Sequence, residues 1–574
     1  MKATKNTYLS IINTFKNYKK SYLKDDIFAG LTVVSVLIPQ AMAYALLAGM
    51  PPIYGLYTGL APLFVYALFA SSTKMSVGPV AVSALLVLSG ISTLAKPGSP
   101  EYIQLVIMSG LLIGLLQTIM GFFRLGFVVN FLSHAVIVGF TSAAAIIILV
   151  SQLKDALGFS IPDSKHLFDT IKYAALNIVE TNLISLIITI ATVFIIFGLK
   201  KIRRSFPGAF IVVLLSIIFS FFFDLEKYQV ELVGIIPSGL PKFYNIVITW
   251  EEVKLLLPTV LTVTLIGIVE SMGIAKALEA KHNDHHVDPN TELKALGYAK
   301  IAGAFFQAIP SSGSFTRSAI NSEAGAKTTL SSLVAAILML FTLLFFTGVF
   351  YHLPKPVLAG IILVSVFSLF NIKEAKYLLK VSRTDFLMML STFIATLTLG
   401  IELGVLIGVG FSILTILYKI SKPNIVTLGK LSNSNKYKDV TRFSEAEENN
   451  EVIIFRFENQ MFFANINVFR DKVLEFLDTK PSMKHLLLDA SLIHDIDSSG
   501  THILKEIDLL LKEKGVELHM CGAIGSVRDI LYKADLLGEI EVHHLSVADA
   551  VARINDPDQT KEINYRATQQ NVDI

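Results

Sequence analysis

A group of hydrogen-bond donors around one arginine is the first feature of the sequence that could perform chemistry. Segment 309–321 reads IPSSGSFTRSAIN, and it places Arg317 beside Thr316 and several serines, shortly after the helix breakers Pro310 and Gly313. A helix that starts in this segment would direct the free N–H groups of its first turn, with about half a positive charge, toward the break. Amides, hydroxyls and a guanidinium are together the groups that bind an oxyanion.

A second broken segment has the same character. Residues 74–86 read KMSVGPVAVSALL, so that Gly78 and Pro79 precede an apolar helix whose first residues are Val80 and Ala81. Paired broken segments in two halves of a transporter indicate its central binding site, where two half-helices meet near the midplane with their N-termini facing each other. Two simpler interpretations stay open, because Gly and Pro are common in spanning helices and because a structural ion pair would also explain the arginine.

Glu270 is the acidic counterpart of these donors. It lies in VESMGIAK, after fifteen residues without charge. A charged side chain near the middle of a membrane costs at least about 2.5–3.5 kcal/mol, so it normally faces a cavity or an opposite charge. We expect Arg317 to be the partner of Glu270. Because burial favours the neutral form of a carboxyl group, we also expect Glu270 to bind and release a proton.

The elements that would position these residues are membrane-spanning helices. Mean hydropathy is +0.60, and only 17% of the residues are charged, against about 25% in a soluble protein. Residues 27–73 contain no Asp, Glu, Lys or Arg, and several later runs exceed the roughly 18 apolar residues that mark a spanning helix. The sequence predicts an all-α polytopic membrane domain of about fourteen spans. Their predicted starts are residues 27, 53, 79, 102, 128, 181, 207, 255, 292, 314, 328, 354, 385 and 402.

Basic residues predict the orientation of these spans. Lys and Arg gather before the first span, at 200–204 and at 373–383, and positively charged loops face the cytoplasm. The turns at 48–55, 351–356 and 399–404 carry little positive charge and suit the other side. We therefore expect an even number of spans in the cell membrane, with both termini cytoplasmic.

A change in charge divides the chain. Residues 1–423 carry a net charge of +11, whereas residues 424–574 carry −8, so the tail is not expected to bind nucleic acid. The tail also contains the only cysteine, Cys521, so no disulfide can form within the chain. The predicted organisation is a cytoplasmic N-terminal segment, a transport domain, a linker, an α/β domain and a C-terminal tail, at 1–26, 27–422, 423–437, 438–555 and 556–574 respectively.

Strands and helices alternate along the acidic tail. EVIIFRF and VELHMCG are typical of buried strands, while THILKEIDLLLKEKG has apolar residues at helical spacing and ends at Gly515. Such alternation predicts an α/β layer. At the start of that helix, Asp497 or Ser498 is suited to cap the free amides.

Several motifs together resemble the SulP anion transporters, the family of the sulfate permeases and of the motor protein prestin. They are SVLIPQAMAYALLAGMPPIYGLYT, MSVGPVAVSALL, VESMGIAKAL, VDPNTELKALG and GSFTRSAINSEAGAKT, in this order along the chain. The resemblance implies a seven-plus-seven inverted repeat, divided into a mobile core domain and a gate domain, with elevator-like movement of the anion site. It also implies a homodimer embedded in the lipid bilayer.

The same resemblance implies roles for individual residues. Positions in the first, third and tenth spans match those that line the anion pocket or start its half-helices, namely Gln40, Tyr44, Val80, Ala81, Phe315, Thr316 and Arg317. Glu270 matches the acidic position of the eighth span. The sodium-coupled bicarbonate members have Asp at this position and Thr one turn later, where this chain has Glu270 and Ile274. This difference favours a proton over sodium as the coupling ion.

The tail carries a second resemblance. LLLDASLIHDIDSSGTHIL is similar to the STAS domain, a module shared with anti-sigma factor antagonists, and it suggests a place where a cytoplasmic regulatory protein could bind. In those soluble relatives the serine directly after an Asp is phosphorylated, and Ser498 matches it, but we favour the capping of the helix over phosphorylation at this position. No metal site is expected, although KHNDHHVDPN at 281–290 holds three histidines and two aspartates, because this segment is a predicted solvated loop.

Three classes of function differ in what they require. An enzyme would need a nucleophile with a base, or a set of metal ligands, and the sequence shows neither. An anion channel or uncoupled exchanger would use the same site without protonation of Glu270. We therefore expect a secondary active transporter, with a proton as the coupling ion and no other cofactor. Sulfate is the first choice of anion on family frequency, and bicarbonate or a dicarboxylate is the alternative.

Overall fold

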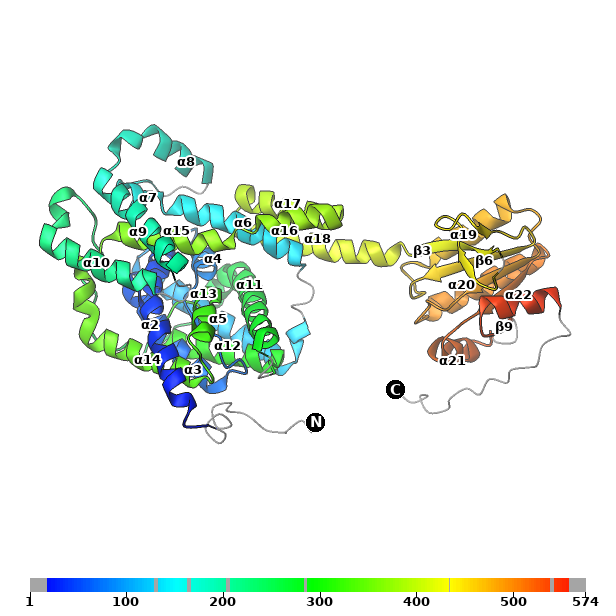
Figure 1. The fold of residues 1–574 in the computed structure, drawn as a ribbon, viewed down its shortest axis with the longest axis horizontal. Coiled ribbons are helices and arrows are strands. Elements are labelled where there is room, and N and C mark those ends of the chain that lie inside the picture. Colours follow the sequence, from blue (N-terminus) through cyan, green and yellow to red (C-terminus); the bar gives the residue numbers. More distant parts are fainter. Residues whose placement is uncertain are drawn as a thin grey trace. The chain divides into compact units, whose positions relative to one another are not determined.

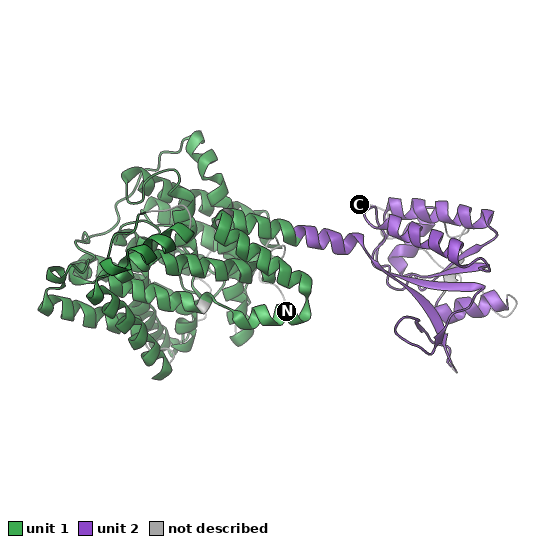
Figure 2. Ribbon diagram, turned by 90° about the horizontal axis from the view of Figure 1, so that it is seen from above, with its two compact units in different colours: residues 1–412 green, residues 413–574 purple. Residues whose placement is uncertain are grey.

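The computed structural model consists of two compact units, residues 1–412 (unit 1) and residues 413–574 (unit 2) (Figure 2). It describes residues 18–127, 133–162, 167–202, 207–282, 286–432, 434–536 and 541–556. Unit 1 is helical, and unit 2 combines a β-sheet with helices (Figure 1). Helix α18 (Ile401–Ser421) runs through the division between the units.

Unit 1 is built from helices, and its described connections include a long one at residues 229–249. Its other α-helices are α2 (Tyr22–Leu47), α3 (Pro52–Phe69), α4 (Ala81–Ile91), α5 (Pro100–Phe122), α6 (His134–Ser151), α7 (Leu153–Leu157), α8 (Leu167–Leu176), α9 (Leu183–Ile202), α10 (Gly208–Phe223), α11 (Trp250–His282), α12 (Pro289–Phe305), α13 (Phe315–Glu323), α14 (Leu330–Phe341), α15 (Lys355–Val366), α16 (Ile372–Val381) and α17 (Arg383–Leu399). Short 3-10 helices are η2 (Ile178–Glu180), η3 (Leu225–Tyr228), η5 (Thr347–His352) and η6 (Phe367–Leu369), and η4 (Thr342–Phe346) is a short π-helix.

Many of these helices suit a membrane. Among the described residues, eight helices are long and apolar enough to cross one, and α4, α10 and α15 are shorter apolar helices. A helix begins within about five residues of each predicted span start, except the start at 128, which lies outside the described residues. The number of crossings stays a prediction.

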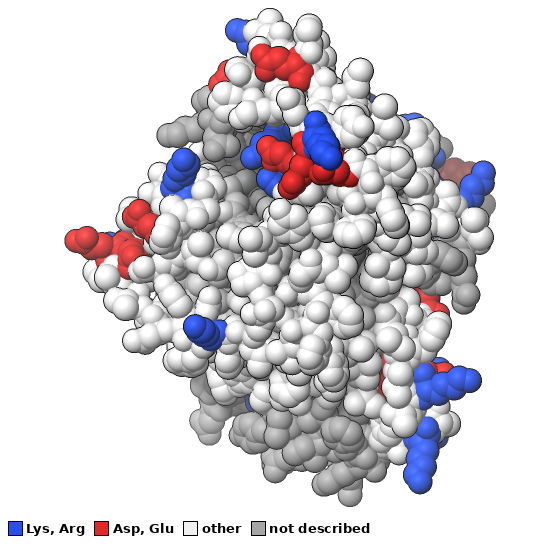
Figure 3. Space-filling view, turned by 90° about the vertical axis from the view of Figure 1, so that its left-hand side faces the viewer, with Lys and Arg blue, Asp and Glu red and all other residues white. Residues whose placement is uncertain are grey.

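The surface of unit 1 is consistent with contact with lipid. Over the face drawn in Figure 3, charged side chains are sparse and most of the surface carries neither sign. Large apolar side chains such as Ile187 and Phe194 on α9 and Phe219 and Phe222 on α10 are exposed. An aqueous surface rarely carries so many exposed apolar side chains together, whereas a lipid-facing surface requires them.

Two short helices start at the predicted breaks. Helix α4 begins two residues after Pro79, and α13 begins two residues after Gly313. The residues that precede them form a small antiparallel sheet of β1 (Val77–Gly78) and β2 (Ser312–Gly313). Proline and glycine prevent either helix from extending backwards, so both chains become extended here and pair with each other.

The helices around the two breaks pack reciprocally. Helix α2 packs on α13 and α14, whereas α11 packs on α4 and α5, and α3 lies against α12. The helices α6, α9, α10, α15 and α17 pack mainly on one another and reach the first group chiefly through α2. Each break is therefore held by helices from the other half of unit 1.

Unit 2 is a mixed sheet covered by helices on both faces. Its strands are β3 (Asn424–Leu431), β4 (Tyr437–Asp439), β5 (Ala446–Glu447), β6 (Val452–Glu458), β7 (His485–Asp489), β8 (Glu517–Cys521) and β9 (Glu541–His544). The order is β4-β3-β6-β7-β8-β9, with β3 antiparallel to β6 and the following pairs parallel. Helices α19 (Ile466–Thr479), α20 (Ser498–Glu513) and α21 (Gly525–Lys533) contribute to the core on one face, and α22 (Val547–Asn555) covers the other.

Strand β3 lies within the segment 423–437 that the sequence suggested as a linker. It pairs with β4, β5 and β6 and is thus part of the sheet. Its sequence NIVTLGKL carries four large apolar residues, but they do not alternate with polar ones, so the period of a half-buried strand is missing. The residues from 557 onward, which include most of the predicted C-terminal tail, lie outside the described residues.

Candidate anion-binding site

The sheet β1–β2 brings the two broken segments together. Val77 lies opposite Gly313 and Gly78 opposite Ser312, and the amide of Ser314 donates to the carbonyl of Ser76 at 3.0 Å. The first turns of α4 and α13 therefore start from one small piece of backbone structure. This is the juxtaposition of two half-helix starts that the sequence predicts.

Both helix starts present backbone donors. Helix α4 has Val80 as its N-cap residue, and the apolar side chain of Val80 does not cap the amides of the first turn. Helix α13 is capped in part, because Ser314 Oγ accepts from the amide of Arg317 at 3.4 Å. The first amides of an α-helix have no acceptor within the helix, so both starts retain N–H groups for a ligand.

Arg317 supplies the charge of the site. Its side chain is fully buried, and Nη1 donates to Gln40 Oε1 at 3.1 Å. Within the described part of the chain, Nε and Nη2 have no hydrogen-bond partner. Because an unsatisfied buried donor is costly, these two groups indicate a place where an acceptor from outside the protein can bind.

Gly78 makes room for this guanidinium. A Cβ atom at Gly78 would lie 3.1 Å from Arg317 Nη2 and 3.3 Å from Leu37 Cδ1. Such contacts are closer than side chains normally accept, so the position favours glycine even though its backbone needs no left-handed conformation. The glycine of the broken segment therefore serves the arginine as well as the helix break.

Helix α2 contributes two of the predicted residues. Gln40 lies directly after Pro39, a proline inside the helix, and its carbonyl oxygen orients Arg317. Tyr44, one turn further along, is buried and its hydroxyl interacts with Ser365 of α15. Phe315 is the exception among the predicted residues, since its side chain is 58% exposed.

Glu270 lies near the site but does not form the expected ion pair. Its Oε2 atom is buried and, among the described residues, has no hydrogen-bond partner. The charges of Glu270 and Arg317 influence each other, yet no described contact within 4 Å joins the two groups, and Arg317 is bonded to Gln40 instead. The expectation of a direct partner is therefore not met, and the residue of α11 that contacts the broken segment is the neighbouring Ser271.

Ser271 attaches α11 to the broken segment. Its Oγ atom lies 3.0 Å from Ser312 Oγ and accepts from the amide of Gly313 at 3.1 Å. A movement of the broken segment would therefore be transmitted to α11 and to the adjacent Glu270.

A cavity of about 190 Å³ lies beside these residues. Gln40, Thr316 and Ser365 contribute polar groups to its wall, and Lys200 and Glu323 contribute charged ones. One water molecule occupies about 30 Å³ in the liquid, so the cavity has room for a small oxyanion with part of its hydration shell. Helices from both packing groups line it, with α2 and α13 on one side and α9, α10 and α15 on the other.

Three residues near the site were not singled out from the sequence. The sequence indicates Gly78 only as a helix breaker, and Ser271 carries no signal by itself. Lys300 on α12 is another buried basic residue, and it donates to Gln117 Oε1 at 2.9 Å. Lys300 carries the same sequence signal as Arg317, because both are basic residues within an apolar segment.

The other sequence candidates lie apart from this site. In the loop 281–290, the described histidines bind protein groups, with His282 Nε2 2.6 Å from Ser322 Oγ and His286 Nδ1 2.8 Å from Glu279 Oε1, while residues 283–285 lie outside the described residues. In unit 2, Asp497 caps α20 by accepting from the amide of Gly500 at 2.8 Å. Ser498 is the exposed first residue of that helix, and its phosphorylation stays the untested alternative to the capping role.

Comparison with known proteins adds three kinds of match. Residues 23–392 match the model of the sulfate permease family, and residues 444–550 match the STAS domain. "Sulfate transporter 4.1, chloroplastic" of Arabidopsis thaliana is 39% identical over 87% of this chain and 75% of its own length. "Probable sulfate transporter 4.2" of the same organism is 38% identical over 94% of this chain and 83% of its own length. A solved structure of SLC26A9 aligns with a TM-score of 0.86 at 26% identity, covering 96% of this chain and 93% of that one.

Proposed function

The chain belongs to the sulfate permease family, and from this premise we propose that it is a secondary active transporter that moves sulfate with protons across the cell membrane. The predicted family and the fold class, a helical membrane domain followed by an α/β STAS domain, are confirmed. The protein is thus a multi-pass membrane protein and an anion transporter. The identity of the anion, the coupling ion and the mechanism are the parts that we propose.

The unsatisfied guanidinium of Arg317 is the observation that carries the proposal. Two of its nitrogen atoms are buried without a protein acceptor among the described residues, next to two helix starts whose amides are also available. An oxyanion with several acceptor oxygens, such as sulfate, could bind to all of these donors together. Sulfate is favoured over other oxyanions because the curated relatives at 38–39% identity carry that substrate in their names.

The packing of unit 1 supports an elevator mechanism. The site residues belong to the group formed by α2–α5 and α11–α14, whereas the opposite wall of the cavity comes from α9, α10 and α15. Movement of the first group along the second would carry the anion without dismantling the half-helix pair, which β1 and β2 join. The reciprocal packing of the two halves also suits the inverted repeat that the resemblance to the SulP family implies.

The cavity of this conformation is open toward the cytoplasm in our proposal. Its lining extends from Gln40 and Thr316 to Lys200 and Glu323. Lys200 belongs to the basic segment 200–204, which the distribution of positive charge assigns to the cytoplasmic side together with both termini. The site would thus release sulfate inward.

Glu270 is the residue that we assign to proton coupling. Its buried, unpaired carboxyl oxygen makes the ionised form expensive unless a positive charge is near. An anion bound at Arg317 would offset the positive charge that stabilises ionised Glu270, so that anion binding favours protonation. Sulfate and proton would then cross together, and the loaded site would carry less uncompensated charge through the apolar wall.

Uptake by proteoliposomes tests this function. The purified chain should concentrate labelled sulfate against its gradient when the outside is acidic and sodium is absent. Glu270→Gln should abolish this accumulation and retain sulfate–sulfate exchange without a pH gradient, whereas Glu251→Gln at the exposed start of the same helix should behave like the wild type. Concentration of sulfate by Glu270→Gln under the same gradient would exclude Glu270 as the proton carrier, and failure of the wild type to take up sulfate would exclude the substrate.

The assembly is proposed by family resemblance. A homodimer is expected, with the STAS domain of each chain available to a cytoplasmic regulatory protein. That domain matches its family model over 444–550 and has its own hydrophobic core, which suits an independent module.

A further inference from the structure

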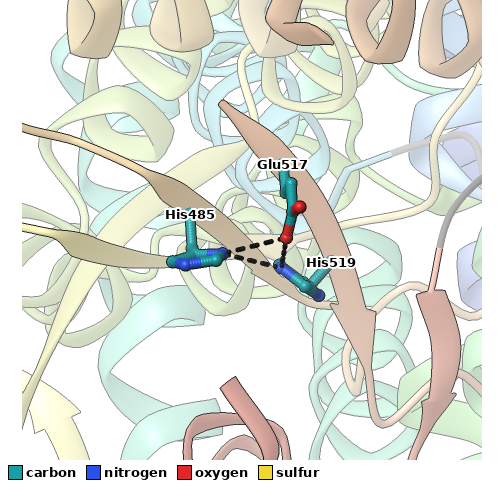
Figure 4. A group of neighbouring side chains, drawn as sticks. All are labelled: His485, Glu517 and His519. Atoms are coloured by element: carbon teal, nitrogen blue, oxygen red, sulfur yellow. Dashed lines mark hydrogen bonds and ion pairs between the residues drawn. The ribbon is translucent and has the colours of Figure 1, made fainter. Parts of the chain in front are cut away.

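Two histidines and a glutamate converge on the sheet of unit 2, far from the anion site in the sequence. His485 starts β7 and Glu517 starts β8, and the two are paired in the parallel register of these neighbouring strands. His519 lies two residues after Glu517, so both side chains point to the same face of the sheet. Figure 4 shows the three side chains directed at one point.

One atom of each side chain forms a closed triangle. His485 Nδ1 lies 3.1 Å from His519 Nε2 and 3.3 Å from Glu517 Oε2, and His519 Nε2 lies 3.6 Å from the same Oε2. A hydrogen bond between the two imidazole rings would explain only the distance between their nitrogen atoms. The two nitrogen–oxygen sides exceed the roughly 2.7–2.9 Å of a charge-assisted hydrogen bond.

The triangle has the size of one face of a tetrahedral metal site. Zinc binds histidine nitrogen at about 2.0–2.1 Å and carboxylate oxygen at about 2.0–2.2 Å, so two ligands at the tetrahedral angle lie about 3.3–3.5 Å apart. Octahedral neighbours would lie about 2.8–3.1 Å apart, and a trans pair in a square plane about 4 Å apart. The three observed distances are centred on the tetrahedral value, and all are shorter than a trans pair.

The surroundings suit a metal with one open position. The side chain of His519 is 6% exposed and that of His485 is 25% exposed, whereas Glu517 is 69% exposed. The histidines are therefore fixed at the sheet, and solvent reaches the site from the side of the glutamate. Imidazole nitrogen with one carboxylate oxygen is a ligand set that suits zinc, and a water molecule would complete the tetrahedron.

We propose that His485, Glu517 and His519 form a binding site for a divalent transition metal, with Zn²⁺ as the preferred ion. The site is separate from anion transport, because all its ligands belong to unit 2. A bound ion would link the beginnings of β7 and β8 and stabilise the STAS domain against unfolding. The three ligands are spread over 35 positions and form no compact motif, which is why the sequence predicts no metal site here.

Metal binding by the purified full-length chain tests the proposal. The untagged protein, stripped with a chelator, is titrated with Zn²⁺ in competition with a chromophoric chelator, and with Co²⁺ as a spectroscopic probe. We expect one ion per chain and the visible absorption of tetrahedral cobalt. His485→Asn should weaken binding at least tenfold and remove the cobalt bands, and Glu517→Gln should weaken binding in the same direction.

His502→Asn is the matched control. His502 is an exposed histidine of α20 outside the triangle, and its replacement should leave affinity and absorption unchanged. His519 is buried and its loss could unfold the domain, so the partly exposed His485 and Glu517 decide the result. Equal zinc affinity of the wild type and His485→Asn, or no tetrahedral cobalt absorption in the wild type, would overturn the proposal.

Discussion

Arg317 is a buried cation with only one protein acceptor for its guanidinium among the described residues. Gln40 binds Nη1, while Nε and Nη2 face no acceptor. An uncompensated buried charge is strongly destabilising, so the arrangement depends on an acceptor from outside the protein. Binding of the anion and stability of the site are therefore linked, and a bound anion should also raise the resistance of the protein to unfolding.

Gly78→Ala should weaken anion binding without unfolding the protein. The new methyl group would lie 3.1 Å from Arg317 Nη2, and the end of a flexible side chain would move away from it. Displacement of a positioned donor by a fraction of an ångström should raise the KM for sulfate by about 3- to 10-fold. Arg317→Ala should cost more, about 10- to 100-fold, because it removes the charge-assisted hydrogen bonds themselves.

Gly273→Ala is the control for this effect. Gly273 lies on α11, close in sequence to Glu270, and a Cβ atom at this position meets nothing within 4 Å. Sulfate uptake kinetics of the two variants should therefore differ. If Gly78→Ala keeps the wild-type KM, the guanidinium does not occupy the binding position that we assign to it.

The ionisable residues of the site could be predicted from the sequence, whereas their contacts could not. Arg317 and Glu270 stand out because charges are rare in apolar segments. The bond from Arg317 to Gln40 joins residues 277 positions apart, and the role of Gly78 as space for a side chain depends on that fold. The predicted pairing of Arg317 with Glu270 assumed that opposite charges in one apolar region must touch.

The connections beside the broken helices are held by two buried acids. On α12, Glu292 accepts from the amides of Ser71 at 2.9 Å and Ser72 at 3.1 Å, and also from Tyr66 Oη and Ser71 Oγ. On α2, Asp26 accepts from the amides of residues 327 and 328 at 2.7 Å and 3.0 Å. Each acid attaches a connection of one half to a helix of the other half.

Glu292→Gln should therefore destabilise unit 1 rather than alter anion affinity. An amide offers one acceptor oxygen and introduces a donor among groups that are all donors here. We expect the free energy of unfolding in detergent to fall by roughly 1.5–3 kcal/mol, with a larger loss for Glu292→Ala. Glu180→Gln, at an exposed turn, should leave it unchanged, and equal stability of Glu292→Gln and wild type would contradict the role of this acid.

Ala319→Cys should report on the opening of the cavity. Ala319 lines it one turn after Thr316, and the native Cys521 is buried, where burial raises the pKa of its thiol and keeps it unreactive. A thiol reagent applied from the cytoplasmic side should label Ala319→Cys, and sulfate should slow the labelling. Ala48→Cys, fully buried away from the cavity, should stay unlabelled, and labelling of Ala319→Cys from the outside alone would reverse the assigned orientation.

The positions of the helices could be predicted from the sequence, whereas the contact between the two broken segments could be predicted only in part. Long apolar runs, Gly78 with Pro79, and Pro310 with Gly313 indicate where α4 and α13 begin. Strands of two residues have no measurable period, so neither β1 nor β2 nor their register could be derived from the pattern. The buried acid Glu292 was likewise hidden, because an acid near a predicted span start is normally solvated.

The two units divide the functions of the chain. Every predicted residue of the anion site lies within unit 1, and unit 2 has a separate hydrophobic core. Removal of residues 424–574, which contain all the strands of unit 2, should lower expression or transport rate and leave the order of anion preference unchanged. Competition of unlabelled anions with labelled sulfate measures this order, and a new preference would show that unit 2 shapes the site.

A shorter deletion, from residue 438 onward, is the informative comparison. It would keep β3 and remove β6, the partner that covers its edge. An unpaired strand edge promotes association between chains, so this variant should aggregate more than the deletion from residue 424. Equal monodispersity of the two in size-exclusion chromatography would argue against β3 as part of the sheet.

The composition of the chain shows that it has a membrane part and a soluble part, but it locates the boundary between them only approximately. The change from +11 to −8 in net charge separates membrane and soluble parts, because lipid excludes charge and water does not. It does not report where the sheet begins, since the apolar residues of β3 do not alternate with polar ones as in a half-buried strand. The proposed metal ligands of unit 2 could not be predicted from the sequence for the same reason as the pairing of β1 with β2. Both depend on contacts between strands that are distant in the sequence, and such contacts leave no local sequence pattern.

The pairing of β1 with β2 has a consequence for biosynthesis. Val77 leaves the ribosome more than 230 residues before its partner Gly313, which at about 5–20 residues per second is roughly 10–50 s of translation. Throughout that interval the first half of the transporter is inserted but its broken helix has no partner. A chain that stops before β2 has neither Arg317 nor a second half-helix, and it would present polar backbone inside the membrane. Membrane quality control could therefore distinguish an unfinished chain from a finished one by this unpaired break alone.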